Sequence, residues 1–127
     1  MKKAVEIFRR SLALMGATDY EENEVLRENA VSLINVLLSQ LYGLDLDLRG
    51  EKRVEGDSLP QIYTLEDRLN LSEPILFSVM PLGLAGYLLN EEDPQRSMFF
   101  LQLYRTEYDI LQNRAKQSRR HKIERRF

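Results

Sequence analysis

The strongest constraint on the fold is a run of fifteen residues, 75–89 (ILFSVMPLGLAGYLL), that contains no charged side chain. The run is apolar on almost every side of a helical projection, so other elements must cover it all round. It is too short, and too marked by proline and glycine, to cross a bilayer. Pro81 should kink the helix because its ring displaces one backbone hydrogen bond. The small residues Gly83, Ala85 and Gly86 should let another helix approach closely.

Two helices are expected before this run. The first covers residues 2–15, where apolar residues recur at the helical period. The second covers residues 20–42, with Thr18 or Asp19 as its N-cap and Gly43 as its end. Charged residues interrupt the apolar stretch of the first helix, so a signal peptide is not expected there. We therefore expect a soluble protein.

Two further helices follow. The apolar run should begin a third helix after Ser72 as N-cap, with Pro74 in the first turn. The fourth helix should run from Pro94 towards residue 117, with Asp93 as its cap. Residues 44–72 lose the helical period: LDLDLRG alternates as a short strand would, GEKRVEGDSLP reads as loop, and QIYTL would be a return strand. The predicted fold class is all-α: a four-helix bundle-like domain with a long irregular loop, or a small β-hairpin, between helices 2 and 3.

The chain ends in a block of positive charge. Residues 114–127, here called the basic arm, carry seven Lys/Arg and one Glu, a formal +6, whereas the other 113 residues have a formal charge of −8. A charge block of this kind usually marks an interaction tail. We divide the chain into a helical domain, 1–113, and this arm, 114–127. Because like charges with little apolar area do not fold alone, the arm is expected to be disordered or frayed in the monomer.

Catalytic chemistry is not indicated by the residue types. The chain has no cysteine, and its single histidine, His121, lies among positive charges without an orienting partner. Carboxylates occur in pairs or clusters, but without the spacing of a metal-binding loop; these are Asp45, Asp47, Glu91, Glu92 and Asp93. The sequence therefore predicts no enzyme activity, no metal and no cofactor.

A second apolar side appears on two of the helices. Two residues of the first helix, and three of the fourth, stand away from the main apolar stripes. Either they pack against neighbours inside their own domain, or they form a subunit interface. The candidate interface residues are Ile7, Leu14, Phe99, Leu103 and Ile110.

The order of these features resembles a known family. EIFRRSLALMGA leads into ENAVSLINVLLSQLYGLDL, and QIYTLEDRLNL precedes LFSVMPLGLAGYLLNEED and then FFLQLYRTEYDILQNRAK. This arrangement, over residues 5–116, is similar to the small helical head-to-tail adaptor (connector, or head-completion) proteins of tailed bacteriophages and prophages. The motifs are short, so the likeness lies in their order and spacing.

The resemblance implies that the protein is a structural component of the virion. Such adaptors form a ring, typically of twelve copies, on the portal protein at the capsid vertex. They extend the channel for double-stranded DNA, without sequence-specific contacts, towards the next stopper or tail protein. The resemblance places this chain at the head–tail junction, and in the host cytoplasm during assembly, with no membrane contact. It also makes the basic arm a portal-docking segment, through Arg114, Lys116, Arg119, Arg120, Lys122, Arg125, Arg126 and Phe127.

Two other functions remain open from the residues alone. The basic arm would also suit a nucleic-acid-binding module, although the acidic remainder of the chain would repel the same phosphates. A small regulatory or chaperone-like protein, whose tail folds on a partner, is the third interpretation. Phosphate binding would weaken steeply as salt rises, whereas ring assembly would depend on protein concentration.

Overall fold

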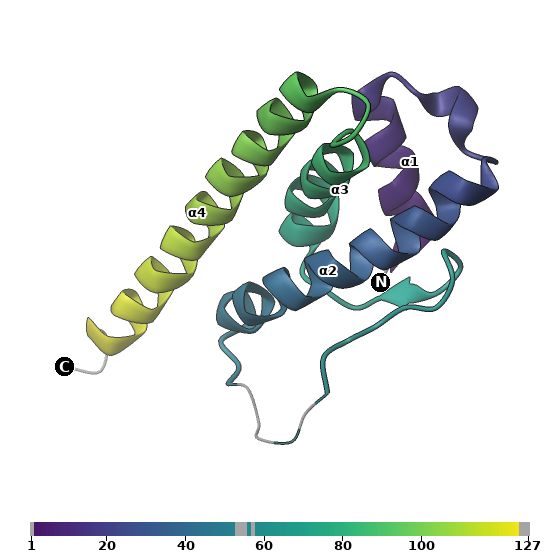
Figure 1. Ribbon diagram of the computed structural model, residues 1–127. Coiled ribbons are helices and arrows are strands. Elements are labelled where there is room, and N and C mark those ends of the chain that lie inside the picture. The colour runs from purple at the N-terminus through teal and green to yellow at the C-terminus, as the bar shows by residue number, and fades with distance from the viewer. Residues whose placement is uncertain (1, 53–55, 57, 125–127) are drawn as a thin grey trace.

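The structure, a computed structural model, describes residues 2–52, 56 and 58–124, and of residues 119–124 it describes the backbone. The predicted all-α class is confirmed: the described residues form four α-helices and a sheet of two very short strands (Figure 1). The helices are α1 (Ala4–Met15), α2 (Glu24–Arg49), α3 (Met80–Leu88) and α4 (Pro94–Glu124). The short elements are β1 (Lys2–Lys3), the 3₁₀ turn η1 (Thr18–Tyr20), β2 (Arg68–Leu69) and the π-helical turn η2 (Ile75–Val79).

The apolar run forms the centre of the domain, as expected. Figure 1 shows α3 between α1 and α4, with α2 crossing beside it. Val79, Met80, Leu84 and Ala85 have no exposed surface. The close approach predicted at the glycines is present, since a Cβ built on Gly83 would lie 2.7 Å from Leu37 of α2 and 2.9 Å from Tyr104 of α4.

Where a kink was expected near Pro81, the structure has the π-helical turn η2 immediately before α3. In this turn the Met80 N–H donates to the carbonyl of Ile75, five residues earlier. Pro81 has no N–H for the carbonyl of Phe77, four residues earlier. That carbonyl instead accepts a 3.2 Å hydrogen bond from Nη1 of Arg10, whose guanidinium also lies 4.4 Å from the centre of the Phe77 ring. The proline is therefore accommodated by a contact with α1.

The predicted limits of the second helix were wrong at both ends. Asn23, rather than Thr18 or Asp19, is the N-cap, and its Oδ1 accepts from the N–H of Leu26 at 2.9 Å. The helix continues through Gly43 to Arg49. Residues 44–48 are helical and do not form the predicted strand. Leu44 and Leu48 are four residues apart, so in a helix both lie on the face of α2 that packs against the core. This packing outweighs the alternation of leucine and aspartate that suggested a strand.

By length and composition α2 is also the one described helix that could cross a membrane. The apolar composition of α2 is explained by its place in the core, where five of its side chains are completely buried: Ala30, Ile34, Leu37, Leu38 and Leu41.

The 50–72 connection is attached to the domain at several points. Asn35 of α2 exchanges two hydrogen bonds with the backbone of Ile62, at 2.8 and 2.9 Å. The strand partner of β2 is the N-terminal β1, in antiparallel register, and residues 61–65 form no strand. The first N–H groups of α1, on Ala4 and Val5, donate to carbonyl groups of this connection. The connection thus closes the N-terminus of α1.

A turn over residues 63–67 shapes this contact. The Asp67 carboxylate accepts from the backbone N–H groups of Tyr63 and Thr64 at 2.7 and 3.0 Å. These bonds favour the charged form and hold the pKa of Asp67 below its usual value.

Residues 73–88, which contain η2 and α3, form the third helical segment. Asp45 joins α2 to the start of this segment. Its carboxylate is buried, accepts from both the N–H and the hydroxyl of Ser72 at 2.7 Å, and pairs with Nε of Arg49 at 3.0 Å. Ser72 precedes the helix as expected, but its hydroxyl donates to Asp45 instead of capping the helix. The predicted start of α4 is confirmed, since Oδ1 of Asp93 accepts from the N–H of Arg96 at 3.2 Å and Pro94 is the first residue.

Asp45→Ala should destabilise the domain by about 2–3 kcal/mol, because it leaves the N–H and hydroxyl of Ser72 without their acceptor. Glu51→Ala removes an exposed carboxylate from the following turn and should change the free energy of unfolding by less than about 0.5 kcal/mol. Urea unfolding followed by circular dichroism measures both, and equal effects would contradict the anchoring role of Asp45.

Gly83→Ala and Gly43→Ala should shift stability in opposite directions. At Gly83 the new methyl would overpack against Leu37 and Tyr104, at a cost of about 1–3 kcal/mol. At Gly43, inside α2, nothing lies within 4 Å of the new methyl, so the variant should gain up to about 1 kcal/mol of helix propensity. Thermal unfolding of the two variants tests this, and a Gly83→Ala variant as stable as the parent would contradict the packing described here.

Candidate functional site

The basic arm is helical as far as the structure describes it. Arg114 and Lys116 are exposed on α4, and Arg119, Arg120 and Lys122 lie on its last turns. Arg125, Arg126 and Phe127 lie outside the described residues. The expectation of a disordered arm was therefore wrong up to residue 124. The arm continues a helix that the core has already nucleated, and its Arg, Lys, Gln and Ala residues favour helix, so each added residue costs little.

Helix α4 continues without interruption through the boundary proposed at residue 113. Ala115 is 4% exposed and Leu111, one turn earlier, is equally buried. The arm thus begins inside the domain and leaves it after Ala115. At 1.5 Å per residue, the nine residues from 116 to 124 extend about 13 Å further. Figure 1 shows this end of α4 far from the connection between α1 and α2.

Most of the candidate interface residues are available at the surface. Leu14, Phe99 and Ile110 are 43%, 57% and 46% exposed, and Leu103 is half-buried. Ile7 is the exception: it is 1% exposed within the core of its own domain. The interface role predicted for Ile7 was therefore wrong, because the second apolar side of α1 is covered at this position by the chain itself.

Of the exposed candidates, Leu14 borders a hollow between α1 and the third helical segment. The hollow has a volume of about 470 Å³ and is lined by Arg10, Ala13, Leu14, Phe77, Ser78, Pro81 and Leu82. Leu82 and Leu103 pack against the same small cluster of Ala85, Leu89 and Phe100, which brings α3 and α4 together here. We call Leu14, Leu82, Phe99, Leu103 and Ile110 the apolar face. Sequence analysis missed Leu82, because every neighbour in the run is apolar and the pattern offers no contrast.

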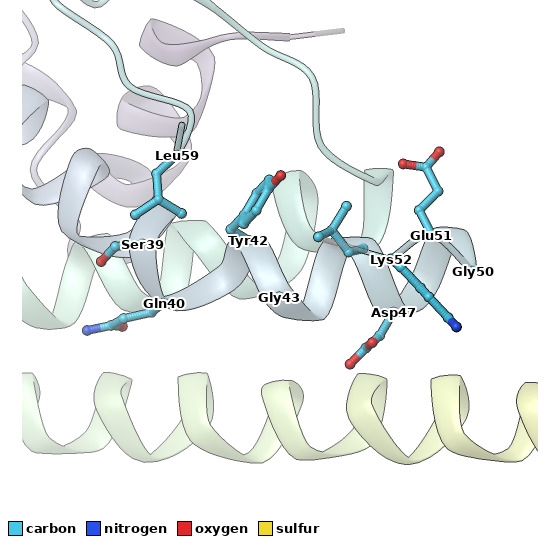
Figure 2. A pocket seen from close by; sticks show the side chains of 10 residues that line it. Ser39, Gln40, Tyr42, Gly43, Asp47, Gly50, Glu51, Lys52 and Leu59 are labelled. Atoms are coloured by element: carbon cyan, nitrogen blue, oxygen red, sulfur yellow. The ribbon is translucent and has the colours of Figure 1, made fainter. Parts of the chain in front are cut away.

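A second hollow, of about 740 Å³, lies along the C-terminal half of α2 and the start of the following loop. Figure 2 shows Gln40 and Asp47 on the side of α2 that faces α4, and Tyr42 and Leu59 on the other side. Gln40 accepts a 2.7 Å hydrogen bond from the Tyr104 hydroxyl and donates to the Tyr87 hydroxyl at 3.0 Å. Burial raises the pKa of Tyr104 well above its ordinary value, so this hydroxyl remains a proton donor. The network joins α2, α3 and α4.

The carboxylates considered for metal binding do not come together. Asp45 is occupied by Ser72 and Arg49, and Asp93 caps α4. Within the described residues, no three His, Cys, Asp or Glu side chains are grouped so that they could hold a metal ion. His121 lies on α4 beyond the buried part of the helix.

Comparisons with protein-family models, with curated proteins and with solved structures give no match. Two surfaces therefore bear on the function of the protein: the basic arm and the apolar face.

At high salt, where contacts between charges are screened, Phe99→Asp with Ile110→Asp should abolish self-association at high protein concentration. Thermal stability should remain nearly unchanged, because about half of each side chain is exposed. Met98→Asp is the matched control: Met98 is 62% exposed but lies about 100° around α4 from Phe99. Sedimentation velocity of the three proteins gives the answer. Self-association that survives at high salt in the double variant would show that the apolar face is not an interface.

Proposed function

We propose that this protein is a structural, non-enzymatic adaptor of the head-to-tail connector of a tailed bacteriophage or prophage. It forms a ring on the portal protein, docks through the basic arm, and extends the DNA channel towards the next stopper or tail protein. The observation that carries the proposal is the projecting end of α4, where a helix anchored in the domain extends a basic segment beyond it.

The separation of charge supports docking on a protein rather than on DNA. The arm carries +6 and the remaining 113 residues −8. A basic helix suits an acidic surface of the portal, and such complementarity speeds encounter and fixes orientation. The acidic domain disfavours adhesion to DNA, since binding of DNA comes mainly from neutralised phosphates. DNA would then pass through the channel without sequence-specific contact.

The apolar face supports assembly into a ring. Single exposed apolar residues are ordinary. Phe99, Leu103 and Ile110, however, fall on one side of α4 at 100° per residue. Leu103 packs against the same cluster as Leu82, and Leu82 lines the hollow that Leu14 also lines. A closed ring needs two different patches on each subunit, which contact each other around the symmetry axis. The apolar face supplies one of them. The copy number, about twelve, comes from the family resemblance alone.

Nucleic-acid binding is the second candidate, and the helical form of the arm is the observation that favours it. A rigid basic helix can follow a groove of DNA or RNA, and its affinity would fall steeply with salt. The adaptor function needs neither a cofactor nor a membrane, and it places the protein in the virion at the capsid vertex after assembly in the host cytoplasm.

A pull-down from the native source separates the two candidates. The intact chain is compared with a chain that ends after Ser118, which keeps Leu111 and Ala115 in place. A full-length variant, Arg119→Gln with Arg120→Gln and Lys122→Gln, keeps the length of the helix and removes its charge. Partners are identified by mass spectrometry with and without nuclease.

The proposal predicts a portal protein with the intact chain, at least about tenfold less with either variant, and no effect of nuclease. Recovery of nucleic acid instead, with all other partners lost after nuclease treatment, would favour the second candidate. A portal protein recovered equally with all three chains would contradict docking through the arm.

A further inference from the structure

An apolar groove lies at the opposite end of the molecule from the basic arm. It is bordered by the connection between α1 and α2, the first turns of α2, and the turn between α3 and α4, and its volume is about 760 Å³. Tyr20 and Val25, which line it, are 57% and 68% exposed, although they are large apolar side chains. Leu26, Leu33 and Leu88 form its half-buried base. Exposed apolar area of this kind favours a partner.

The surroundings of the groove are acidic. Five carboxylates occur between Asp19 and Glu28 and three more from Glu91 to Asp93. Glu91 and Glu92 line the groove and are exposed, and Glu22, Glu24 and Glu28 are exposed on the adjoining segment; Asp19 is exposed beside Tyr20.

The cations near the groove already have partners within the chain. Arg9 pairs with Glu21, and Arg27 donates to the carbonyl of Glu21 at 3.0 Å. Arg96, which lines the groove, donates to the carbonyl of Met15 at 2.7 Å and lies 6.0 Å from the centre of the Phe100 ring. The rim therefore has an excess of negative charge.

These charges define the chemistry of the occupant. Nucleic acid and anionic lipid surfaces would be repelled by the carboxylates. A cationic segment with a few apolar side chains would gain both from the rim and from the groove. The basic arm has this composition: seven Lys/Arg, with Ile123 and Phe127 four residues apart as its apolar residues after Ala115.

The arm cannot reach the groove of its own chain. It continues α4, which begins next to the groove at Pro94 and runs away from it (Figure 1). At 1.5 Å per residue, the helical axis from Pro94 to Arg119 covers about 38 Å. We propose that the groove binds the basic arm of a second copy of this chain, so that copies associate head to tail.

Such a contact joins two different surfaces, and repeats of it close into a ring or continue as an open filament. The inference does not rest on the portal-docking function. Because one arm cannot hold both surfaces at once, an acidic portal surface would compete with the groove for it.

A charge-exchange experiment with the purified full-length protein tests the inference. One variant reverses two charges of the rim, Glu91→Lys with Glu92→Lys. The other reverses three charges of the arm, Arg119→Glu with Arg120→Glu and Lys122→Glu, which lowers its formal charge from +6 to zero. Both are made in the Phe99→Asp, Ile110→Asp background, so that the apolar face does not contribute. Glu91 and Glu92 are exposed, and circular dichroism checks that each variant is folded.

The background protein should self-associate at low salt, and its association should weaken steeply as salt rises. Each reversed variant alone should associate at least about tenfold more weakly, and an equimolar mixture of the two should restore association, because the basic arm of one meets the acidic groove of the other. A photo-crosslinking residue at Val25 should capture a peptide from residues 114–127 of another copy.

Two results would overturn the inference. The first is a background protein that stays monomeric at every concentration and salt tested. The second is a mixture that associates no more strongly than either reversed variant alone, with no cross-link to the arm. Neither result bears on recovery of the portal, so this inference and the adaptor function fail independently.

Discussion

The fold depends on the burial of one helical segment that has no polar side. With Leu76, Val79, Met80 and Leu84 essentially unexposed, this segment needs neighbours in several directions at once, and α1, α2 and α4 provide them. Its interior also contains Pro81, which deprives one carbonyl of its donor. Arg10 supplies that donor from α1 while stacking on Phe77. The position of α1 is thus tied to the most apolar part of the chain through a charged side chain.

Small residues decide how closely the helices meet at this segment. Gly83 and Gly86 face Tyr104 and Leu101 of α4 at distances that leave no room for a methyl group. This close packing fixes the direction of α4 along its first half. Further on, Leu111 and Ala115 hold it against the domain, so the basic residues that follow start from a rigid base. The arm therefore has a definite direction, as far as residue 124, before any partner binds.

The sequence predicts correctly those elements in which apolar and polar residues are clearly separated or a capping residue is present. The central segment, the capped start of α4 at Asp93 and the overall helical class follow from apolar content and capping chemistry. It failed at residues 44–48, where leucines two and four apart satisfy both a strand and a helix, and only packing against the core decides between them. It also failed for the arm, because composition alone does not reveal that a preceding helix has already met the cost of nucleation. The apolar face was only partly identified. Ile7 and Leu14 both stand away from the main apolar stripe of α1, but Ile7 is buried in the core of its own domain and Leu14 is exposed.

The two ends of the molecule have opposite chemistry. One end presents a basic helix, and the other an apolar groove with an acidic rim, with the apolar face along the side between α1 and α4. In the proposed assembly, the arm would bind either the portal or the groove of another copy, and the apolar face would lie against a neighbouring subunit. In the proposed function, the acidic charge of the domain would disfavour adhesion of DNA.

Immunogold electron microscopy of tailed particles from the native source tests the central claim most directly. An epitope tag is placed before Lys2, at the end of the chain remote from the arm. The adaptor function predicts gold at the junction of head and tail, once per particle. Particles without gold there, with the tagged protein recovered only on nucleic acid or free in the lysate, would contradict it.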